Sequence, residues 1–119
     1  MSLSDDVRRV FAETEDEYQA ARQKQKKQRE KRIADSREKA KKAIQALPNN
    51  IREARRQGEF YLIVYKFTDF EYAGALDAGK QENLLYGAKD FADALSEGGF
   101  HVVTHKNSLS PGGEIRIHW

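Results

Sequence analysis

A long stretch of the sequence, residues 5–47, has no helix-breaking residue. It contains no glycine and no proline. It is rich in glutamine, lysine, arginine, glutamate and alanine, which all have high helix propensity. Ser4 is a suitable N-cap, and Asp5 and Asp6 fall in the first turn, where the helix dipole favours negative charge. The sequence therefore predicts a long, charged N-terminal helix.

The length of this helix limits the arrangements open to the chain. One helix over residues 5–47 would be about 64 Å long at 1.5 Å per residue, which is more than a body of about 60 residues can cover. Either the helix projects, or it folds back as a helical hairpin. The stretch Leu47-Pro48-Asn49-Asn50 predicts a break or kink, followed by a short helix over residues 50–57 that ends at Gly58.

The rest of the chain alternates between strand and helix patterns. Residues 59–67, EFYLIVYKF, predict a strand, and residues 68–82 predict a loop. A helix is expected over residues 83–97, where Gly98-Gly99 stops it, and a β-hairpin over residues 100–119. The predicted fold class is α+β: a long charged helix, a short helix, and a β-α-β-β body with a small three-stranded sheet.

Apolar side chains predict how the body packs. The strand at 59–67 carries apolar residues at both odd and even positions, so we expect cover on both of its faces. The helical residues 33–57 and the 83–97 helix are expected to share one sheet face. Trp119 ends the last strand and is expected in the core, so that deleting Ile117–Trp119 should lower thermal stability.

Charge divides the chain into an arm and a body. Residues 1–58 carry 16 Lys and Arg against 10 Asp and Glu, whereas residues 59–119 carry 5 against 9. The total of +2 is too small to indicate a polyanionic partner by itself. We expect a helical arm over residues 1–47 and a compact α+β body over residues 48–119.

The most basic part of the arm is RQKQKKQREKR, residues 22–32, which we call the basic segment. It has seven cations, one Glu and no apolar side chain. Helical periodicity spreads these cations around the helix, and no leucine heptads follow as in a basic zipper. One interpretation is that the basic segment is a solvated helix. Its cations could also pair with the acids at residues 13–17, either within a folded-back arm or in a second copy of the chain. The other is contact with nucleic acid or an acidic protein through Arg22, Lys24, Lys26, Lys27, Arg29, Lys31 and Arg32.

An apolar stripe precedes the basic segment. Val7, Val10, Phe11 and Tyr18 recur at helical spacing. An apolar face on an arm beyond the body needs something to cover it. Either the arm packs back onto the sheet, or the stripe forms a homo-oligomer interface.

The histidines all fall on the predicted hairpin. Strand alternation places His101 and His105 on one face, and a register that sets His101 opposite His118 and His105 opposite Glu114 would gather them there. Such a group could hold a divalent metal, but it matches no known ligand motif. Solvent-facing histidines are the expectation, and no metal site is predicted.

The predicted loop carries acids and aromatic residues. Asp69, Glu71 and Asp77 could serve catalysis or magnesium binding, although acids commonly keep a loop soluble. Phe70 and Tyr72 are expected to anchor the loop to the core. The sequence contains no nucleophile-and-base motif and no phosphate-binding glycine pattern.

Several classes of protein are excluded or disfavoured. The chain has no cysteine, which excludes disulfides and Cys-ligated zinc and fits a cytoplasmic location. No apolar run is long enough to cross a membrane, and the N-terminal residues do not predict a secretory signal. We expect a non-enzymatic interaction protein without a cofactor, acting through the basic segment. The alternative is an assembly protein that self-associates through its N-terminal helix.

Overall fold

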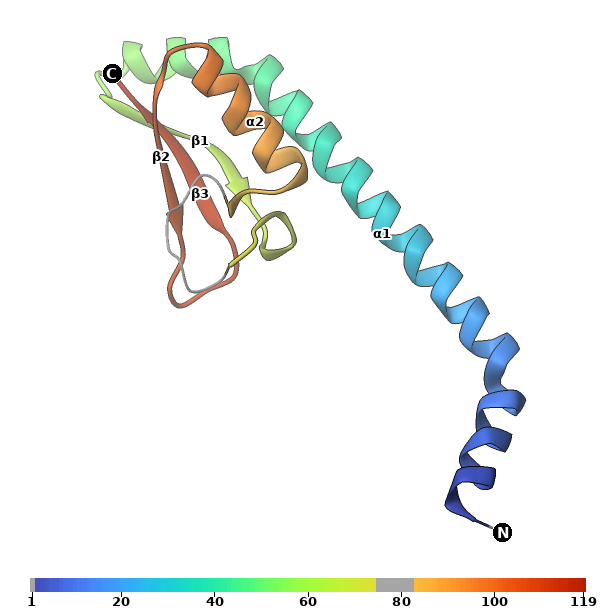
Figure 1. Ribbon diagram of the computed structural model, residues 1–119. Helices are drawn as coiled ribbons and strands as arrows, with labels where there is room; N and C mark the ends of the chain where they lie inside the picture. Colours follow the sequence, from blue (N-terminus) through green and yellow to red (C-terminus); the bar gives the residue numbers. More distant parts are fainter. Residues whose placement is uncertain (1, 75–82) are drawn as a thin grey trace. The chain divides into compact units, whose positions relative to one another are not determined.

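A single helix, α1, spans Leu3–Arg56 in the computed structural model, which describes residues 2–74 and 83–119 (Figure 1). The long N-terminal helix is thus confirmed. Its first turn carries Asp5 and Asp6 as expected. The cap lies two residues earlier than predicted, because the Asp5 backbone N–H donates to the Ser2 hydroxyl at 3.3 Å.

Of the break or kink expected at Pro48, the break is wrong, and the kink stays a prediction. Pro48 lies inside α1, and the predicted helix over residues 50–57 is the last part of α1. Proline lacks the N–H that would bond back to the Ile44 carbonyl, which disfavours a helix interior. Leu47 and Ile51, on either side of Pro48, both pack against the hydrophobic core. Tertiary packing therefore keeps the helix continuous where local propensity predicted its end.

The chain divides into two compact units, residues 1–32 and residues 33–119. The described part of the first unit is Ser2 followed by residues 3–32 of helix α1. The second unit contains the rest of α1 and all the described strands.

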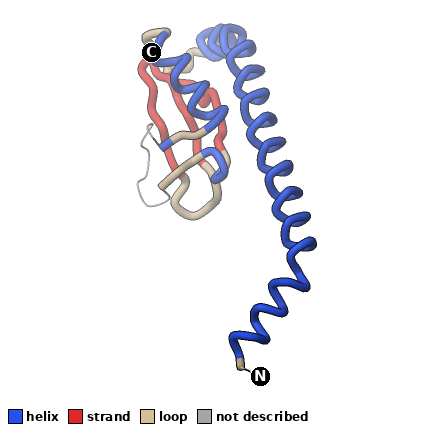
Figure 2. The backbone as a smooth tube through the Cα atoms, turned by 45° about the vertical axis from the view of Figure 1, so that its right-hand side comes forward, coloured by secondary structure: helices blue, strands red, loops and turns tan. Residues whose placement is uncertain are grey.

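Three strands form one antiparallel sheet in the order β1-β3-β2 (Figures 1 and 2). Their bounds are Tyr61–Phe67 for β1, His101–Lys106 for β2 and Gly113–His118 for β3. Because β3 is antiparallel to both neighbours, β1 and β2 point in the same direction. The chain passes from β1 to β2 through the short 3-10 helix η1, Asp69–Glu71, and helix α2, Tyr86–Glu97. The expected α+β fold with a three-stranded sheet is confirmed.

A β-bulge explains why β1 is apolar at both odd and even positions. Leu62 pairs with Ile117, but the register shifts after Ile63, and Tyr65 then pairs with Ile115. The extra residue reverses the alternation, so Leu62 and Tyr65 both face the core. The expectation that both faces need cover is wrong: on the opposite face Tyr61 and Ile63 remain 37% and 38% exposed.

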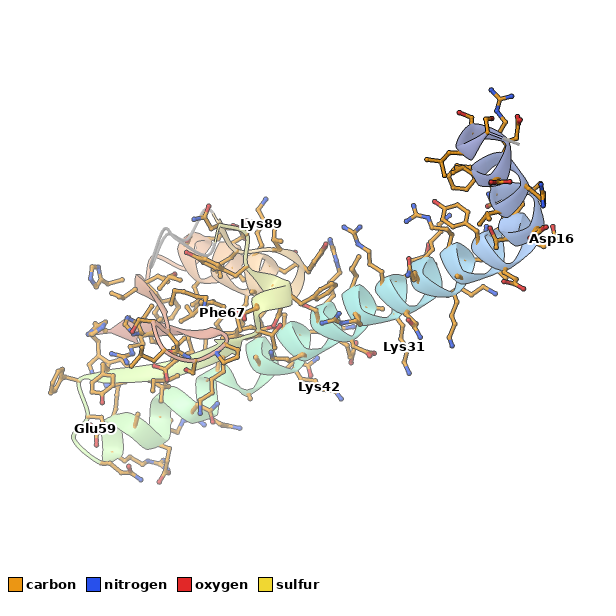
Figure 3. The ribbon with its side chains drawn as sticks, turned by 90° about the horizontal axis from the view of Figure 1, so that it is seen from below. Asp16, Lys31, Lys42, Glu59, Phe67 and Lys89 are labelled. Atoms are coloured by element: carbon orange, nitrogen blue, oxygen red, sulfur yellow. The ribbon has the colours of Figure 1, made fainter. Side chains whose placement is uncertain are left out.

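The core lies between one face of the sheet and the two helices of the second unit. Ile115 and Ile117 of β3 and Phe91 of α2 are fully buried, and Ala40 of α1 belongs to the same cluster. Phe67 lies within the body, whereas the Lys42 side chain extends away from α1 (Figure 3). The expected sharing of this core by residues 33–57 and the later helix is confirmed.

The C-terminal tryptophan is not a core residue. Trp119 remains 42% exposed, because β3 ends at His118 and Trp119 lies past the last core position. Its indole N–H donates to the Glu59 carbonyl at 2.9 Å, and its backbone N–H donates to Phe60 at 3.2 Å. Trp119 thus fastens the chain end to the start of β1.

The loop aromatics are anchors, as expected. Tyr72 is buried and stacks on Phe67 with ring centres 5.4 Å apart. Phe70 stacks on Tyr86 at 4.9 Å. Helix α2 begins at Tyr86, three residues later than predicted. Tyr86 has a positive φ of 52°, so the chain enters α2 in the left-handed region, which is costly for a bulky residue.

Candidate binding surfaces

The basic segment is helical and its predicted contact residues are solvent-exposed. Residues 22–32 lie within α1 in the first unit, and all seven cations are exposed. The Lys31 side chain extends away from the helix (Figure 3). Glutamine, lysine and arginine are good helix formers, and their charged groups need no apolar neighbour to stay solvated.

One face of the basic segment gathers three cations. Arg22, Lys26 and Arg29 line a shallow hollow together with Gln23 and Gln25. The structure thus brings together three of the seven predicted residues. Lys24, Lys27 and Lys31 share a face on the opposite side of the helix, because they follow Arg22 by two, five and nine residues, whereas Lys26 and Arg29 follow it by four and seven. A hollow lined by two guanidinium groups, an ammonium and two amides can bind phosphate or carboxylate oxygens.

The apolar stripe is exposed within its unit. Val7, Val10, Phe11 and Tyr18 remain 40%, 53%, 66% and 56% exposed. Phe11 and Tyr18 line a hollow of about 340 Å³ together with Thr14 and Glu15. Large apolar side chains on one helix face, with this much exposure, are typical of an interaction surface.

A buried carboxylate, that of Glu71, links η1 to helix α1 and strand β1 in the second unit. It is 2% exposed. Its Oε2 accepts hydrogen bonds from the hydroxyls of Ser36, at 2.7 Å, and Tyr65, at 2.5 Å. Its Oε1 accepts from the Lys39 ammonium at 3.0 Å and from the Thr68 backbone N–H at 3.1 Å. We call these five residues the Glu71 cluster.

Ser36 extends the cluster to the start of α2. Its hydroxyl accepts a hydrogen bond from the Gly87 backbone N–H at 3.0 Å while it donates to Glu71. A Cβ at position 87 would overlap the Ser36 carbonyl, so only glycine allows this approach of α2 to α1. Lys39 also donates to the Lys66 carbonyl at 2.7 Å. The network thus holds α1, β1, η1 and α2 together.

The electrostatics of the cluster keep Glu71 ionised and Tyr65 protonated. Burial acts to raise the pKa of Glu71, but hydrogen bonds from Tyr65, Ser36, Thr68 and Lys39 outweigh it and leave the pKa below its ordinary value. Burial raises the pKa of the Tyr65 phenol well above its usual range, and the neighbouring Glu71 carboxylate raises it further.

The chemistry of this cluster is that of a structural network. The carboxylate of Glu71 accepts from donors on both oxygens, so it has little capacity left to act as a base or to coordinate an ion. Asp69 is held through one oxygen: its Oδ1 accepts from the Gly112 N–H at 2.9 Å and pairs with the Lys106 ammonium at 3.2 Å. The Gly112 bond and the Lys106 ammonium lower the pKa of Asp69.

The sequence predicts Asp69, Glu71 and Asp77 in one loop. The structure does not bring Asp69 and Glu71 to a common site, and Asp77 lies outside the described residues. The partners of Glu71 were missed, because Ser36 and Lys39 are 35 and 32 residues away in the sequence. Their spacing of three residues on a helix was the one local signal that they share a face.

The histidines occupy the sheet face opposite the core. The strands pair in the register that was considered for the hairpin, with His101 opposite His118 and His105 opposite Glu114. No group of three or more potential metal-ligating side chains occurs among residues 2–74 and 83–119. We call this the open face. Its side chains are those of Tyr61, Ile63, Lys66, His101, Val103, His105, Glu114, Arg116 and His118.

Comparison of the chain with protein-family models, with curated proteins and with solved structures gives no match. In the part of the chain that the structure describes, no helix has both the length and the apolar character that crossing a membrane requires.

Proposed function

We propose that this chain is a non-enzymatic nucleic-acid-binding protein that contacts phosphates through the basic segment. The observation that carries the proposal is the exposure of seven cations within eleven residues of helix α1, with Glu30 as the one acid among them. Arg22, Lys26 and Arg29 line one hollow. Phosphate contacts of this kind supply affinity without sequence readout.

Fluorescence anisotropy of labelled duplex and single-stranded nucleic acid, at two salt concentrations, tests the proposal. Binding should weaken steeply with salt, because each neutralised phosphate releases counterions. Reversing Lys26, Lys27 and Arg29 to Glu should lower affinity by at least ~10-fold and reduce the salt slope by about 2 to 3. The fold should survive, since all three side chains are exposed.

A matched control separates a local contact from the effect of net charge. Lys41, Lys42 and Arg56 are exposed residues of α1 in the second unit. Reversing all three to Glu changes the net charge by the same amount outside the basic segment, and should lower affinity much less. Equal losses in the two variants would indicate a general charge effect and would sink the assignment to residues 22–32. An acidic protein surface would bind the same cations. If polyglutamate displaced the labelled nucleic acid as effectively as unlabelled nucleic acid does, an acidic protein would be the favoured partner.

The exposed apolar stripe favours a second function, self-association. Its four members and the hollow lined by Phe11 and Tyr18 would be covered by a second copy. The double variant Phe11→Asp, Tyr18→Asp should then yield a smaller species by light scattering. A mass that is the same for the variant and the wild type would rule out this interface. Reversal of Lys26, Lys27 and Arg29 is the control, and should leave the mass unchanged.

A further inference from the structure

Side chains on the open face form rows across the three strands. The pairing of β2 with β3 sets His101 beside His118, and the pairing of β3 with β1 sets His118 beside Tyr61. The next row contains Val103, Arg116 and Ile63 by the same pairings. One row therefore carries a ring on every strand of the sheet, and the row beside it has a guanidinium at its centre.

The rings of the first row contact one another. Tyr61 stacks on His118 with ring centres 5.9 Å apart and an interplanar angle of 28°. His101 meets His118 edge to face at 5.9 Å, and Phe60 meets Tyr61 in the same way at 5.5 Å. Tyr61 is 37% exposed, Phe60 is 66% exposed and His101 is exposed. Aromatic rings held on a rigid sheet and open to solvent are suited to stacking on flat ligands.

The charges next to this row favour an anionic ligand. Arg116 lies 6.0 Å from the centre of the Tyr61 ring, and Lys66 is exposed on the same face. Glu114 is the one acid among the nine side chains of the open face. It accepts two hydrogen bonds from the Arg116 guanidinium, at 2.9 and 3.2 Å. The pair is neutral as a whole, so Lys66 gives the open face its net positive charge, and the carboxylate fixes the guanidinium in position beside the rings.

We propose that the open face binds single-stranded nucleic acid, with bases stacked on the Tyr61, His118 and His101 row and phosphates near Arg116 and Lys66. Unstacked bases bind aromatic side chains and Arg planes, whereas the bases of a duplex are already stacked on each other. This inference rests on the proposed function and narrows it, since it names the class of nucleic acid.

A second copy of the chain fits this face less well. The centre of the open face is the Arg116–Glu114 pair, and charged residues are depleted from the cores of protein interfaces, where aromatic and aliphatic groups dominate. Burying this pair against another sheet would cost desolvation free energy that the half-exposed Ile63 and Val103 side chains would have to offset. A flexible strand of nucleic acid leaves the pair partly hydrated.

The test compares an oligothymidine with a duplex of equal length, by anisotropy, for the wild-type chain and three variants. The wild type should prefer the single strand. The double variant Tyr61→Ala, His118→Ala should lose roughly 10-fold or more in single-strand affinity and change little toward duplex. Phe100→Ala removes a ring of similar exposure outside the open face, and should change neither the single-strand affinity nor the duplex affinity. Reversal of Lys26, Lys27 and Arg29 to Glu should lower both affinities.

Photocrosslinking gives a second readout, on the wild-type chain, that does not depend on the folding of the double variant. An oligothymidine carrying 4-thiothymidine is irradiated with the protein, and tryptic peptides are analysed by mass spectrometry. Adducts are expected on the peptides covering residues 57–66 and 90–106, which contain Tyr61 and His101. Adducts confined to the basic segment would overturn the proposal.

The outcomes separate this inference from the function on which it rests. If the double variant, still folded by circular dichroism, keeps full single-strand affinity while the charge reversal loses it, the open face is not the site and the proposed function stands. A wild type that prefers duplex also overturns the inference alone. If the wild type binds neither probe at low salt, both proposals fail.

Discussion

At the scale of single residues, two buried polar side chains differ in their hydrogen bonding: one has several partners and the other has none among the described residues. Glu71 is surrounded by donors from Ser36, Tyr65, Lys39 and Thr68. Thr104 of β2 faces the core at 8% exposure, and its hydroxyl has no hydrogen-bond partner among the described residues. A buried hydroxyl without a partner costs free energy, because it loses its hydrogen bonds to water.

Thr104→Val should therefore stabilise the protein. Valine has nearly the same shape, so the change removes the unpaired hydroxyl without leaving a cavity. We expect a gain of about 1 kcal/mol in the free energy of unfolding, measured by urea denaturation. Thr104→Ser is the matched control: it keeps the hydroxyl, loses the buried methyl group, and should destabilise. If Thr104→Val proved less stable than the wild type, the hydroxyl would have to be hydrogen-bonded in solution.

The Glu71 cluster should make stability depend on pH at both ends of the range. The pKa of Glu71 is lower in the folded state than its ordinary 4.5, so its contribution is complete above that value and is lost as pH falls through the folded pKa. The pKa of Tyr65 is raised above its ordinary 10.0. Its contribution is therefore complete below pH 10.0 and is lost as the pH rises above that value.

Thermal unfolding at a series of pH values, for the wild type and two variants, checks this dependence. Glu71→Gln should cost about 3 kcal/mol near neutral pH, because it leaves the Lys39 ammonium and two hydroxyls without a carboxylate. The variant should also lose less stability in acid than the wild type does. Part of the acid dependence should remain, because the pKa of Asp69 is lowered as well. Tyr65→Phe should reduce the loss in alkali. A Glu71→Gln variant with the same acid dependence as the wild type would contradict this assignment.

At the scale of elements, the sequence was sufficient to predict those helices and strands that the pattern of neighbouring residues determines. The alternation of Phe100 to His105 and of Glu114 to Trp119 was sufficient to predict the hairpin, which the structure confirms, whereas the observed register was only one of those that the alternation permits. The β1 bulge was not predicted, because a run that is apolar at every position gives no sign of where the register shifts. The role of Glu71 was missed for a related reason: its partners are brought together by tertiary packing and not by local sequence.

Helix α1 contains the clearest conflict between local propensity and tertiary packing. Pro48 lies within the helix, and proline in a helix interior is less favourable than alanine by about 3 kcal/mol. Pro48→Ala should restore the hydrogen bond to the Ile44 carbonyl and stabilise the protein by roughly 1 to 3 kcal/mol. Circular dichroism at 222 nm during urea denaturation measures this.

A second substitution tests whether the gain comes from the proline itself. Ala46→Pro places a proline at an exposed position two residues earlier, and should destabilise by a similar amount. If Ala46→Pro lowered the free energy of unfolding but Pro48→Ala left it unchanged, removing the proline would not have restored the hydrogen bond to the Ile44 carbonyl. The helix at position 48 would then be distorted for a reason other than the proline. Packing of Leu47 and Ile51 should be retained in both variants, since neither side chain is altered.

At the scale of the whole molecule, the hydrophobic core belongs to one unit. Every buried residue among those that the structure describes lies at Ser36 or later, and the two units divide between Arg32 and Ile33. The first unit is helical without buried side chains of its own. Its helix therefore depends on propensity and local pairs such as Arg9 with Asp6, which each contribute only a few tenths of a kcal/mol.

Removing residues 1–32 should therefore leave a folded protein. The fragment of residues 33–119 keeps the Glu71 cluster and the complete core, so its unfolding temperature should lie within a few degrees of that of the full chain, as measured by calorimetry. It should lose the salt-sensitive affinity for duplex that we assign to the basic segment, and retain weaker single-strand binding through the open face. A fragment that fails to fold would mean that residues 1–32 supply cover for the body. A fragment that folds and binds duplex as tightly as the full chain would remove the basic segment from the proposed function.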